Sequence, residues 1–160
     1  MPAIDIVVLP RHARRARHEH RVEGFSRDYR LLESLRELGV DREGASRLAD
    51  LIASRWSVEA PLLTFHRGRG AHTGYCVAPR DVAVARHGND AVIRWESANG
   101  AWAADGMIRL GDPTSLATIA HEFGHHLVHH LDPVATAAHG TRWVRRFDDA
   151  AETIRTLIRM

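Results

Sequence analysis

The spacing of apolar residues predicts helices at both ends of the chain. Apolar side chains three and four positions apart predict an amphipathic helix over about residues 26–39 and a second helix that begins after Asp41. Asp112-Pro113-Thr114 predicts the N-cap and first turn of a third helix, which runs to about Leu131. A fourth helix is predicted over about residues 141–158, where an apolar stripe recurs with helical spacing.

The residue pattern in the middle of the chain predicts short strands. From residue 61 onward, short β-compatible runs alternate with Gly, Asn and Pro, and residues 3–9 predict one further short strand. The runs in the middle are 62–65, 74–77, 82–85, 91–95 and 107–110. Asn99-Gly100 between them predicts a hairpin turn. These signals predict an α+β fold in which a small, mostly antiparallel sheet packs on the 112–131 helix and its flanking helices.

Composition excludes several kinds of chemistry. All 22 basic residues are Arg, and a chain without Lys can form neither a lysine Schiff base nor a Walker-type phosphate loop. The single cysteine, Cys76, excludes an intramolecular disulfide and a multi-cysteine zinc site. This cysteine usage is typical of a reducing compartment, so a cytoplasmic location is expected.

Apolar runs are too short for a membrane span, so no membrane partner is expected. Residues 4–9 are apolar but are followed by basic residues, which is the reverse of the order in a secretory signal.

The basic excess of the chain lies in its first 22 residues. This segment carries five Arg and two acidic residues, net +3, whereas residues 23–160 carry 17 Arg and 18 acidic residues, net −1. We therefore expect a basic arm over 1–22 and a single domain over 23–160. The arginines are candidates for contacts to nucleic-acid phosphates: Arg11, Arg14, Arg15, Arg17 and Arg21. A solvated arm is the favoured interpretation, because the stretch has no aromatic residue for base stacking.

The third predicted helix contains a metal-binding pattern. His121-Glu122-Phe123-Gly124-His125 matches the His-Glu-x-x-His pattern of zincin metallopeptidases. At about 100° per residue, the two histidines lie about 40° apart on the helix surface, so both can reach one cation. Most apolar side chains of this helix point to the opposite side. Glu122 is offset by about 100° from His121 and can contact a water molecule at the metal without being a ligand.

A catalytic zinc ion needs a third protein ligand, for which the sequence offers two candidates. His139 is favoured, because it stands before Gly140, just ahead of the last helix. Glu152 is the alternative, since it is the only glutamate in that helix. A metzincin ligand at position 131 is excluded because that residue is leucine.

Other residues near the motif are expected to have roles other than metal binding. His129 projects on the ligand side of the helix and is expected to interact with groups around the metal site, whereas His126 and His130 are expected to be solvated or to flank the cleft. Tyr75, His129 or a nearby Arg is a candidate donor to a developing oxyanion. Cys76, Trp95 and Trp102 are expected to be packing residues.

The metal motif and the residues around it resemble the SprT-like metalloproteases. The resemblance is carried by Thr118 to His126, which includes the first two histidines, and by His139-Gly140-Thr-Arg-Trp143 at the start of the next helix. It covers about residues 45–158, and this sequence lacks the C-terminal zinc ribbon of longer members. The resemblance implies a zincin-like minimal metalloprotease domain. It also implies that His121, His125 and His139 bind one Zn²⁺ per chain and that Glu122 is the catalytic acid/base.

The activity implied by the resemblance is hydrolysis of peptide bonds in a protein or peptide substrate. Some relatives act on proteins crosslinked to DNA. The His-Glu-Phe-Gly-His-His stretch is also similar to ImmA/IrrE-type regulatory peptidases. The remaining alternatives are a nucleic-acid-associated protein that uses the arginine arm, and a zinc-binding protein without peptidase activity.

Overall fold

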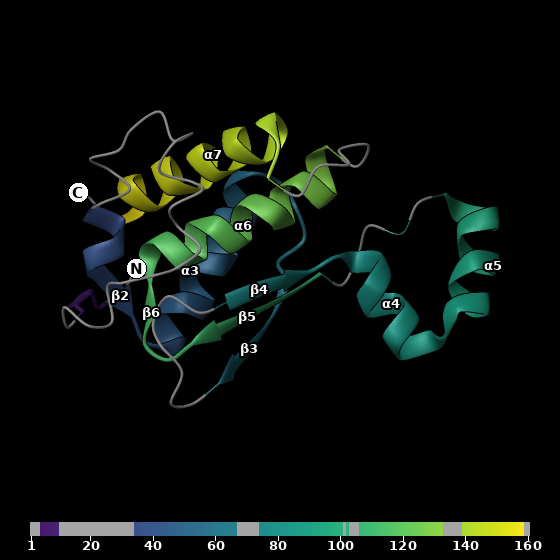
Figure 1. The fold of residues 1–160 in the computed structure, drawn as a ribbon, viewed down its shortest axis with the longest axis horizontal. Helices are drawn as coiled ribbons and strands as arrows, with labels where there is room; N and C mark the ends of the chain where they lie inside the picture. Colours follow the sequence, from purple (N-terminus) through teal and green to yellow (C-terminus); the bar gives the residue numbers. More distant parts are fainter. Residues whose placement is uncertain are drawn as a thin grey trace.

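The computed structural model describes residues 4–9, 34–66, 74–100, 102, 106–132 and 139–158. These residues form an α+β fold with two three-stranded sheets, ordered β1-β2-β6 and β3-β5-β4 (Figure 1). The predicted fold class is therefore confirmed, although a single sheet was expected. Three of the four strand pairs are antiparallel, as the mostly antiparallel prediction required.

The first sheet joins three short strands from distant parts of the sequence. It contains β1 (Val7–Val8), β2 (Leu38–Val40) and β6 (Thr114–Ser115), all paired antiparallel. The strand predicted over residues 3–9 is thus limited to two residues. The helix predicted to reach Gly39 ends earlier: residues 34–37 are helical, and Leu38 pairs with Val8 instead. Residues 26–33 of that prediction lie outside the described residues.

The second sheet lies directly against the helix that carries the metal motif. It contains β3 (Leu62–His66), β4 (Gly74–Val77) and the central strand β5 (Met107–Gly111). β5 runs parallel to β3 and antiparallel to β4. Among the described residues, β4 has a paired neighbour on one side only, so it is an edge strand of this sheet.

The three helices that build the core begin and end close to their predicted positions. They are α3 (Arg42–Arg55), α6 (Leu116–Leu131) and α7 (Thr141–Ile158). The prediction that Asp112-Pro113-Thr114 caps the third helix is wrong by a few residues. Ser115 is the N-cap, and its Oγ accepts a hydrogen bond of 3.0 Å from the Thr118 N–H. No helix among the described residues is long and apolar enough to cross a membrane.

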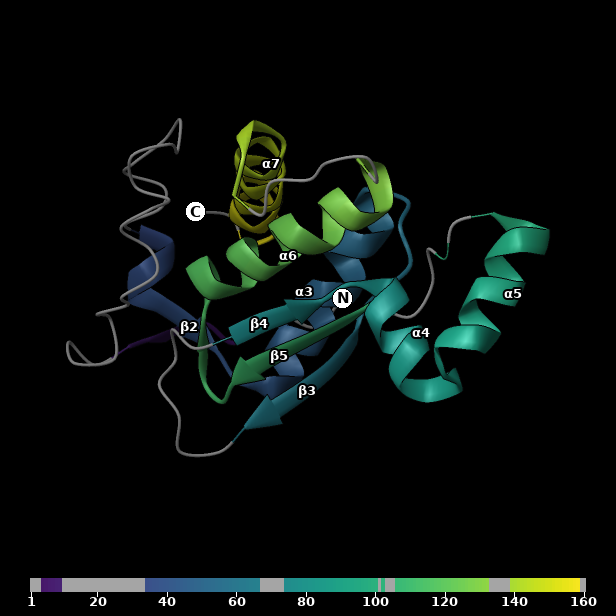
Figure 2. The same ribbon diagram turned by 45° about the vertical axis from the view of Figure 1, so that its right-hand side comes forward.

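The core lies around α6, which is covered on one side by the β3-β5-β4 sheet and on another by α7 (Figure 2). Most of its buried apolar side chains come from α3, β5, α6 and α7, and Leu35 and Val40 add to them. The largest of them include Leu48, Ile108, Phe123, Trp143 and Phe147. Because sheet and helices pack on it from several directions, α6 is a rigid support for any side chain it carries.

The strands predicted over residues 82–85 and 91–95 are wrong, because both runs are helical. α4 (Pro79–His87) begins with proline in its first turn, and α5 (Asn89–Asn99) ends at Gly100, whose φ is 88°. The Gly100 N–H donates to the Glu96 carbonyl at 2.9 Å, so Asn99-Gly100 is a helix end and not a hairpin turn. Short apolar runs fit a strand or a helix equally well, and local hydrogen bonding decides here for the helix.

The α4 and α5 helices pack on each other beside the sheet, away from α7 (Figure 1). Trp95 and Trp102 were predicted to be packing residues, and their rings do lie 4.7 Å apart at this pair of helices. Trp95 is nevertheless 41% exposed, so this contact lies at the surface and outside the main core.

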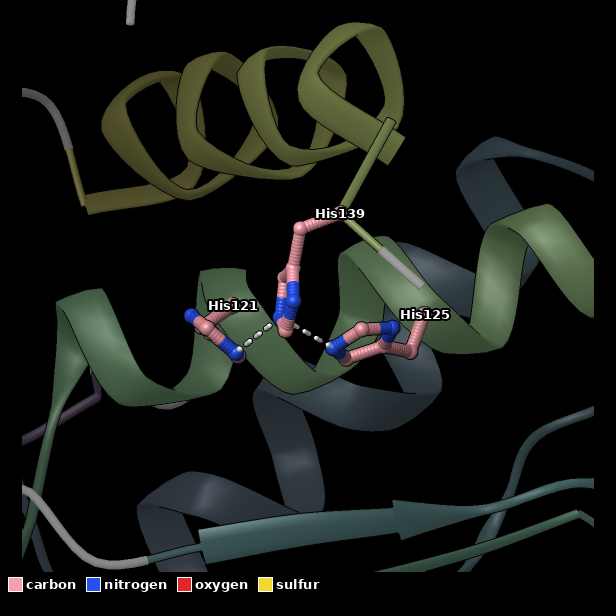
Figure 3. Close-up of side chains that lie close together, drawn as sticks. All are labelled: His121, His125 and His139. Atoms are coloured by element: carbon pink, nitrogen blue, oxygen red, sulfur yellow. Dashed lines mark hydrogen bonds between the residues drawn. The ribbon is translucent and has the colours of Figure 1, made fainter. Parts of the chain in front are cut away.

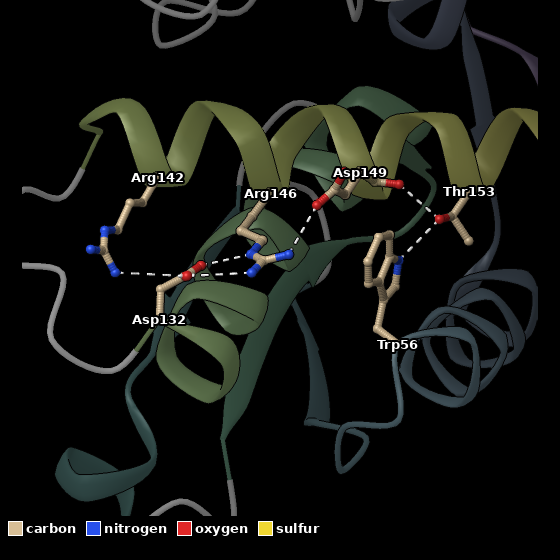
Figure 4. Close-up of polar contacts among 6 residues, drawn as sticks. All are labelled: Trp56, Asp132, Arg142, Arg146, Asp149 and Thr153. Atoms are coloured by element: carbon tan, nitrogen blue, oxygen red, sulfur yellow. Dashed lines mark hydrogen bonds and ion pairs between the residues drawn. The ribbon is translucent and has the colours of Figure 1, made fainter.

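Polar contacts hold the end of α6 to α7 (Figure 4). Asp132, which caps α6, accepts hydrogen bonds from Arg146 Nε at 2.6 Å and Nη2 at 3.3 Å. Arg146 also donates to Asp149 at 3.1 Å. The Trp56 indole donates to the Thr153 hydroxyl at 3.1 Å, which ties the end of α3 to the same helix. These contacts fix α7, and the turn before it, relative to α6.

We expect the Asp132–Arg146 pair to contribute stability that is lost in acid. The hydrogen bond from Arg146 holds the pKa of Asp132 below its ordinary value. The contribution is therefore complete above the ordinary pKa of about 3.9 and disappears as the pH falls through the lower pKa of the folded state. Asp132→Asn should lower the free energy of unfolding by about 1 kcal/mol at pH 7, with less effect near pH 3. Urea unfolding at both pH values measures this difference, and an undiminished effect at pH 3 would contradict the assignment.

Candidate metal centre

Two of the three histidines are placed by α6 itself. His121 and His125 lie one turn apart, and their rings are 5.2 Å from each other. The helix is fixed by its cap at Ser115 and by its buried apolar residues, including Ile119, Phe123 and Leu127. The four-residue spacing of His121 and His125 therefore places both imidazoles on the same side of one rigid helix, as expected from the sequence.

His139 comes from the turn before α7 and reaches the same point (Figure 3). Its Nε2 lies 3.1 Å from His125 Nε2 and 3.3 Å from His121 Nε2. One nitrogen from each of the three rings lies within 4.8 Å of the others. The structure thus brings together the three histidines that the sequence analysis singled out, and this cluster can hold a metal ion.

These distances fit a single small cation. Two imidazole nitrogens on one tetrahedral zinc ion lie about 3.3 Å apart, because each Zn–N bond is about 2.0–2.1 Å long. The two measured separations, 3.1 and 3.3 Å, are close to that value. His139 is exposed, whereas His121 and His125 are partly buried, so the cluster is open to solvent on one side. A metal site with three protein ligands and an accessible fourth position is typical of catalytic zinc.

The surroundings favour neutral imidazoles. Burial, together with the smaller effects of the nearby His121, His139 and His129, lowers the pKa of His125 to about 3. His125 is therefore unprotonated at neutral pH, and a neutral imidazole is the form that binds metal ions.

Glu122 lies beside the histidines but on the side of α6 that faces β4. Its side chain is 5% exposed, and burial raises its pKa to about 8. A Cβ atom at Gly74 would lie 3.3 Å from Glu122 Cγ and 3.0 Å from Thr118 Cγ2. Glycine at this position of β4 therefore allows the strand to pass close over the glutamate, a role that the sequence analysis did not predict.

Two further residues of β4 were assigned roles in the sequence analysis. Cys76 was predicted to be a packing residue, and it is partly buried in the sheet and packs against the core. Burial, followed by the charge of Glu122, raises the pKa of its thiol. Tyr75 was a candidate oxyanion donor. It follows Gly74 and precedes Cys76, so its side chain lies on the opposite face of the sheet, and it is 47% exposed. The structure does not bring Tyr75 to the histidines.

The prediction that His126 is solvated or flanks a cleft is wrong. Its side chain is fully buried, and its Nε2 lies 2.8 Å from the Glu59 carbonyl oxygen. A Cβ at Gly106 would lie 2.8 Å from this ring. The neutral ring that donates to Glu59 joins α6 to the segment before β3, which is a structural role. Burial lowers its pKa to about 4.

His129 and His130 lie beyond the cluster on α6. The His130 ring packs on His126, with centroids 4.3 Å apart, and is half-buried. Burial, followed by the charge of His130, lowers the pKa of His129, whereas Asp81 acts in the opposite direction. His129 also contributes to the lowered pKa of His125. It is thus near the cluster, as predicted, without belonging to it.

The alternative third ligand does not reach the site. Glu152 lies on α7, and its carboxylate forms an ion pair with Arg155 at 2.9 Å. Its side chain is about half exposed. The five arginines of the predicted arm, residues 11–21, lie outside the described residues, as do the other residues between 10 and 33.

Trp143 also belongs to the site, although the sequence analysis assigned it no contact with the histidines. It was named there as part of the His139-Gly140-Thr-Arg-Trp143 segment and as an apolar residue of the last helix. Its ring lies next to all three histidine rings. The signal in the sequence is its place in the first turn of α7, four residues after His139.

Comparisons with protein-family models, with curated proteins and with solved structures found no match.

Proposed function

We propose that this chain is a zinc-dependent metallopeptidase of the SprT-like kind. The convergence of His139 on His121 and His125, at nitrogen separations that suit one zinc ion, carries the proposal. The buried Glu122 beside that cluster is the second support, because peptide hydrolysis at such a centre needs a carboxylate that accepts and returns a proton.

Zinc is the metal that we propose for this site, and its donors are compatible with that choice. Three imidazoles without a carboxylate or thiolate make a nitrogen-only set, which suits Zn²⁺ and not Mg²⁺ or Ca²⁺, since the latter prefer oxygen. When bound, the ion supplies Lewis-acid chemistry that polarises a carbonyl group and activates water. His121, His125 and His139 would hold the ion, because their Nε2 atoms are the ones that converge in the structure.

Glu122 supplies the proton transfer in this proposal. It is held between α6 and β4, where it is largely screened from bulk water. A nearby cation favours the ionised form of a buried carboxylate, which offsets the effect of burial on its pKa. The carboxylate then takes a proton from the attacking water and delivers it to the leaving amine.

The edge strand β4 provides a place for an extended peptide. It pairs with β5 along one side only among the described residues, and its Gly74 lies against Glu122. Unpaired backbone groups on an edge strand can hydrogen-bond to an added strand. A substrate bound in this way would run past the glutamate, so we propose that unfolded or extended protein segments are the substrates.

Incubation of the purified protein with a library of unstructured peptides tests this function. We expect cleavage that stops when 1,10-phenanthroline removes the metal and returns when one equivalent of zinc is added. Mass spectrometry of the products measures both effects. A protein that binds one zinc ion but cleaves no peptide of the library would be a zinc-binding protein without peptidase activity. Cleavage that persists after complete removal of the metal would also contradict the proposal.

A further inference from the structure

Trp143 makes ring contacts with every histidine of the cluster. Its centroid lies 4.6 Å from that of His139, 4.9 Å from that of His121 and 5.3 Å from that of His125. The contacts with His139 and His121 are edge-to-face, with planes at 85° and 61°. Such contacts depend on ring orientation, and they therefore restrict how each imidazole can turn.

Trp143 is itself held in one position. It is 1% exposed, and its indole N–H points to the His121 carbonyl oxygen at 3.4 Å. Phe147, one turn along α7, lies 5.4 Å from the indole ring. A Cβ at Gly124 would lie 3.0 Å from the indole nitrogen, so the glycine inside the histidine motif leaves the space that this ring occupies. The indole ring is therefore held in one orientation, in contact with the three histidine rings.

We propose that Trp143 is a positioning residue for the three-histidine metal centre. It holds the imidazoles of His121, His125 and His139 with their Nε2 atoms together, and it offers an electron-rich ring to imidazoles that become more positive when they bind a cation. This inference rests on the metal-binding part of the proposed function. It goes beyond that function because it proposes that Trp143, which cannot itself be a ligand, increases the affinity of the three histidines for the metal.

Zinc affinity, measured by competition with a chromophoric chelator, tests the proposal. Trp143→Leu keeps all three ligands and is expected to weaken zinc binding roughly 10–100-fold, the range seen when groups that orient metal ligands are removed. The visible spectrum of the Co²⁺-substituted protein should change with it, because the arrangement of the nitrogens changes. Trp143→Phe keeps a ring and is expected to have a smaller effect.

Phe147→Leu is the matched control. Phe147 is equally buried on the same helix, but its ring contacts no histidine ring within the described part of the chain. Its loss should therefore leave zinc affinity within about threefold of wild type while lowering stability. Equal weakening by Phe147→Leu, or affinity within threefold in Trp143→Leu, overturns the proposal. If circular dichroism shows that Trp143→Leu is unfolded, Trp143→Phe decides, since it replaces the indole by a smaller ring that fills part of the same space. Binding weakened beyond that of Phe147→Leu then supports the positioning role, and binding no weaker than that of Phe147→Leu overturns it.

Different results would refute the proposed function and the proposed role of Trp143. A wild-type chain that binds no zinc refutes the proposed function and removes the basis for this inference. A wild-type chain that binds zinc, with a Trp143→Leu variant that binds it as tightly, refutes only the role of Trp143.

Discussion

Replacing Glu122 with glutamine is expected to reduce peptide hydrolysis by about 10²–10⁴-fold and to leave one metal ion per chain. Glutamine has nearly the same shape, so the packing between α6 and Gly74 of β4 is kept. It cannot accept and return a proton, so only the chemical step is affected. Initial rates and metal content, measured on the same preparations, separate the two effects.

Glu152→Gln provides the control for that variant. It removes a carboxylate of the same type from α7, where the side chain is exposed and paired with Arg155. We expect its rate to match wild type within about twofold, since exposed ion pairs contribute little. A Glu122→Gln protein that hydrolyses peptides as fast as this control would show that Glu122 is not the proton-transfer group.

Replacing His139 with alanine is expected to weaken zinc binding by more than about 100-fold, because even groups that only orient metal ligands contribute roughly 10–100-fold. The Nε2 of His139 stands between those of His121 and His125 and approaches each of them within 3.3 Å. Without it two imidazoles on one helix remain. Elemental analysis after dialysis against a weak chelator measures the loss.

The same measurement on two other variants locates the third ligand. Glu152→Ala and His129→Ala should retain the metal, because neither side chain belongs to the cluster. Retention of tight zinc by His139→Ala, together with its loss in Glu152→Ala, would transfer the third ligand to Glu152.

The parts of the fold that the sequence predicted best are those governed by local periodicity. α6 and α7 each show an apolar stripe over four or more turns, and their observed ends lie close to the predicted ones. The spacing of His121 and His125 on α6 is a local property of the same kind. His139 reaches His121 and His125 from a different part of the chain, so local periodicity does not predict this contact. Its position just before α7 nevertheless restricts it to the region around the start of that helix.

The errors arose where distant segments decide the structure. Helical geometry gives the direction of His126 but not its partner, which is the Glu59 carbonyl oxygen 67 positions away. The contact of Gly74 with Glu122 depends on how β4 pairs with β5 over α6, which spacing along the chain does not reveal. The errors at α4 and α5 have a different, local cause: a short apolar run is compatible with a helix and with a strand, so it does not distinguish the two.

Anomalous diffraction at the zinc absorption edge, from crystals of the protein purified without added metal chelators, locates any zinc ion that the protein binds. We expect one anomalous peak per chain, located about 2.0–2.1 Å from the Nε2 atoms of His121, His125 and His139 and coordinated by no other protein atom. A peak bound by other residues, or a crystal structure of zinc-loaded protein in which the three histidines carry no metal, would contradict this expectation.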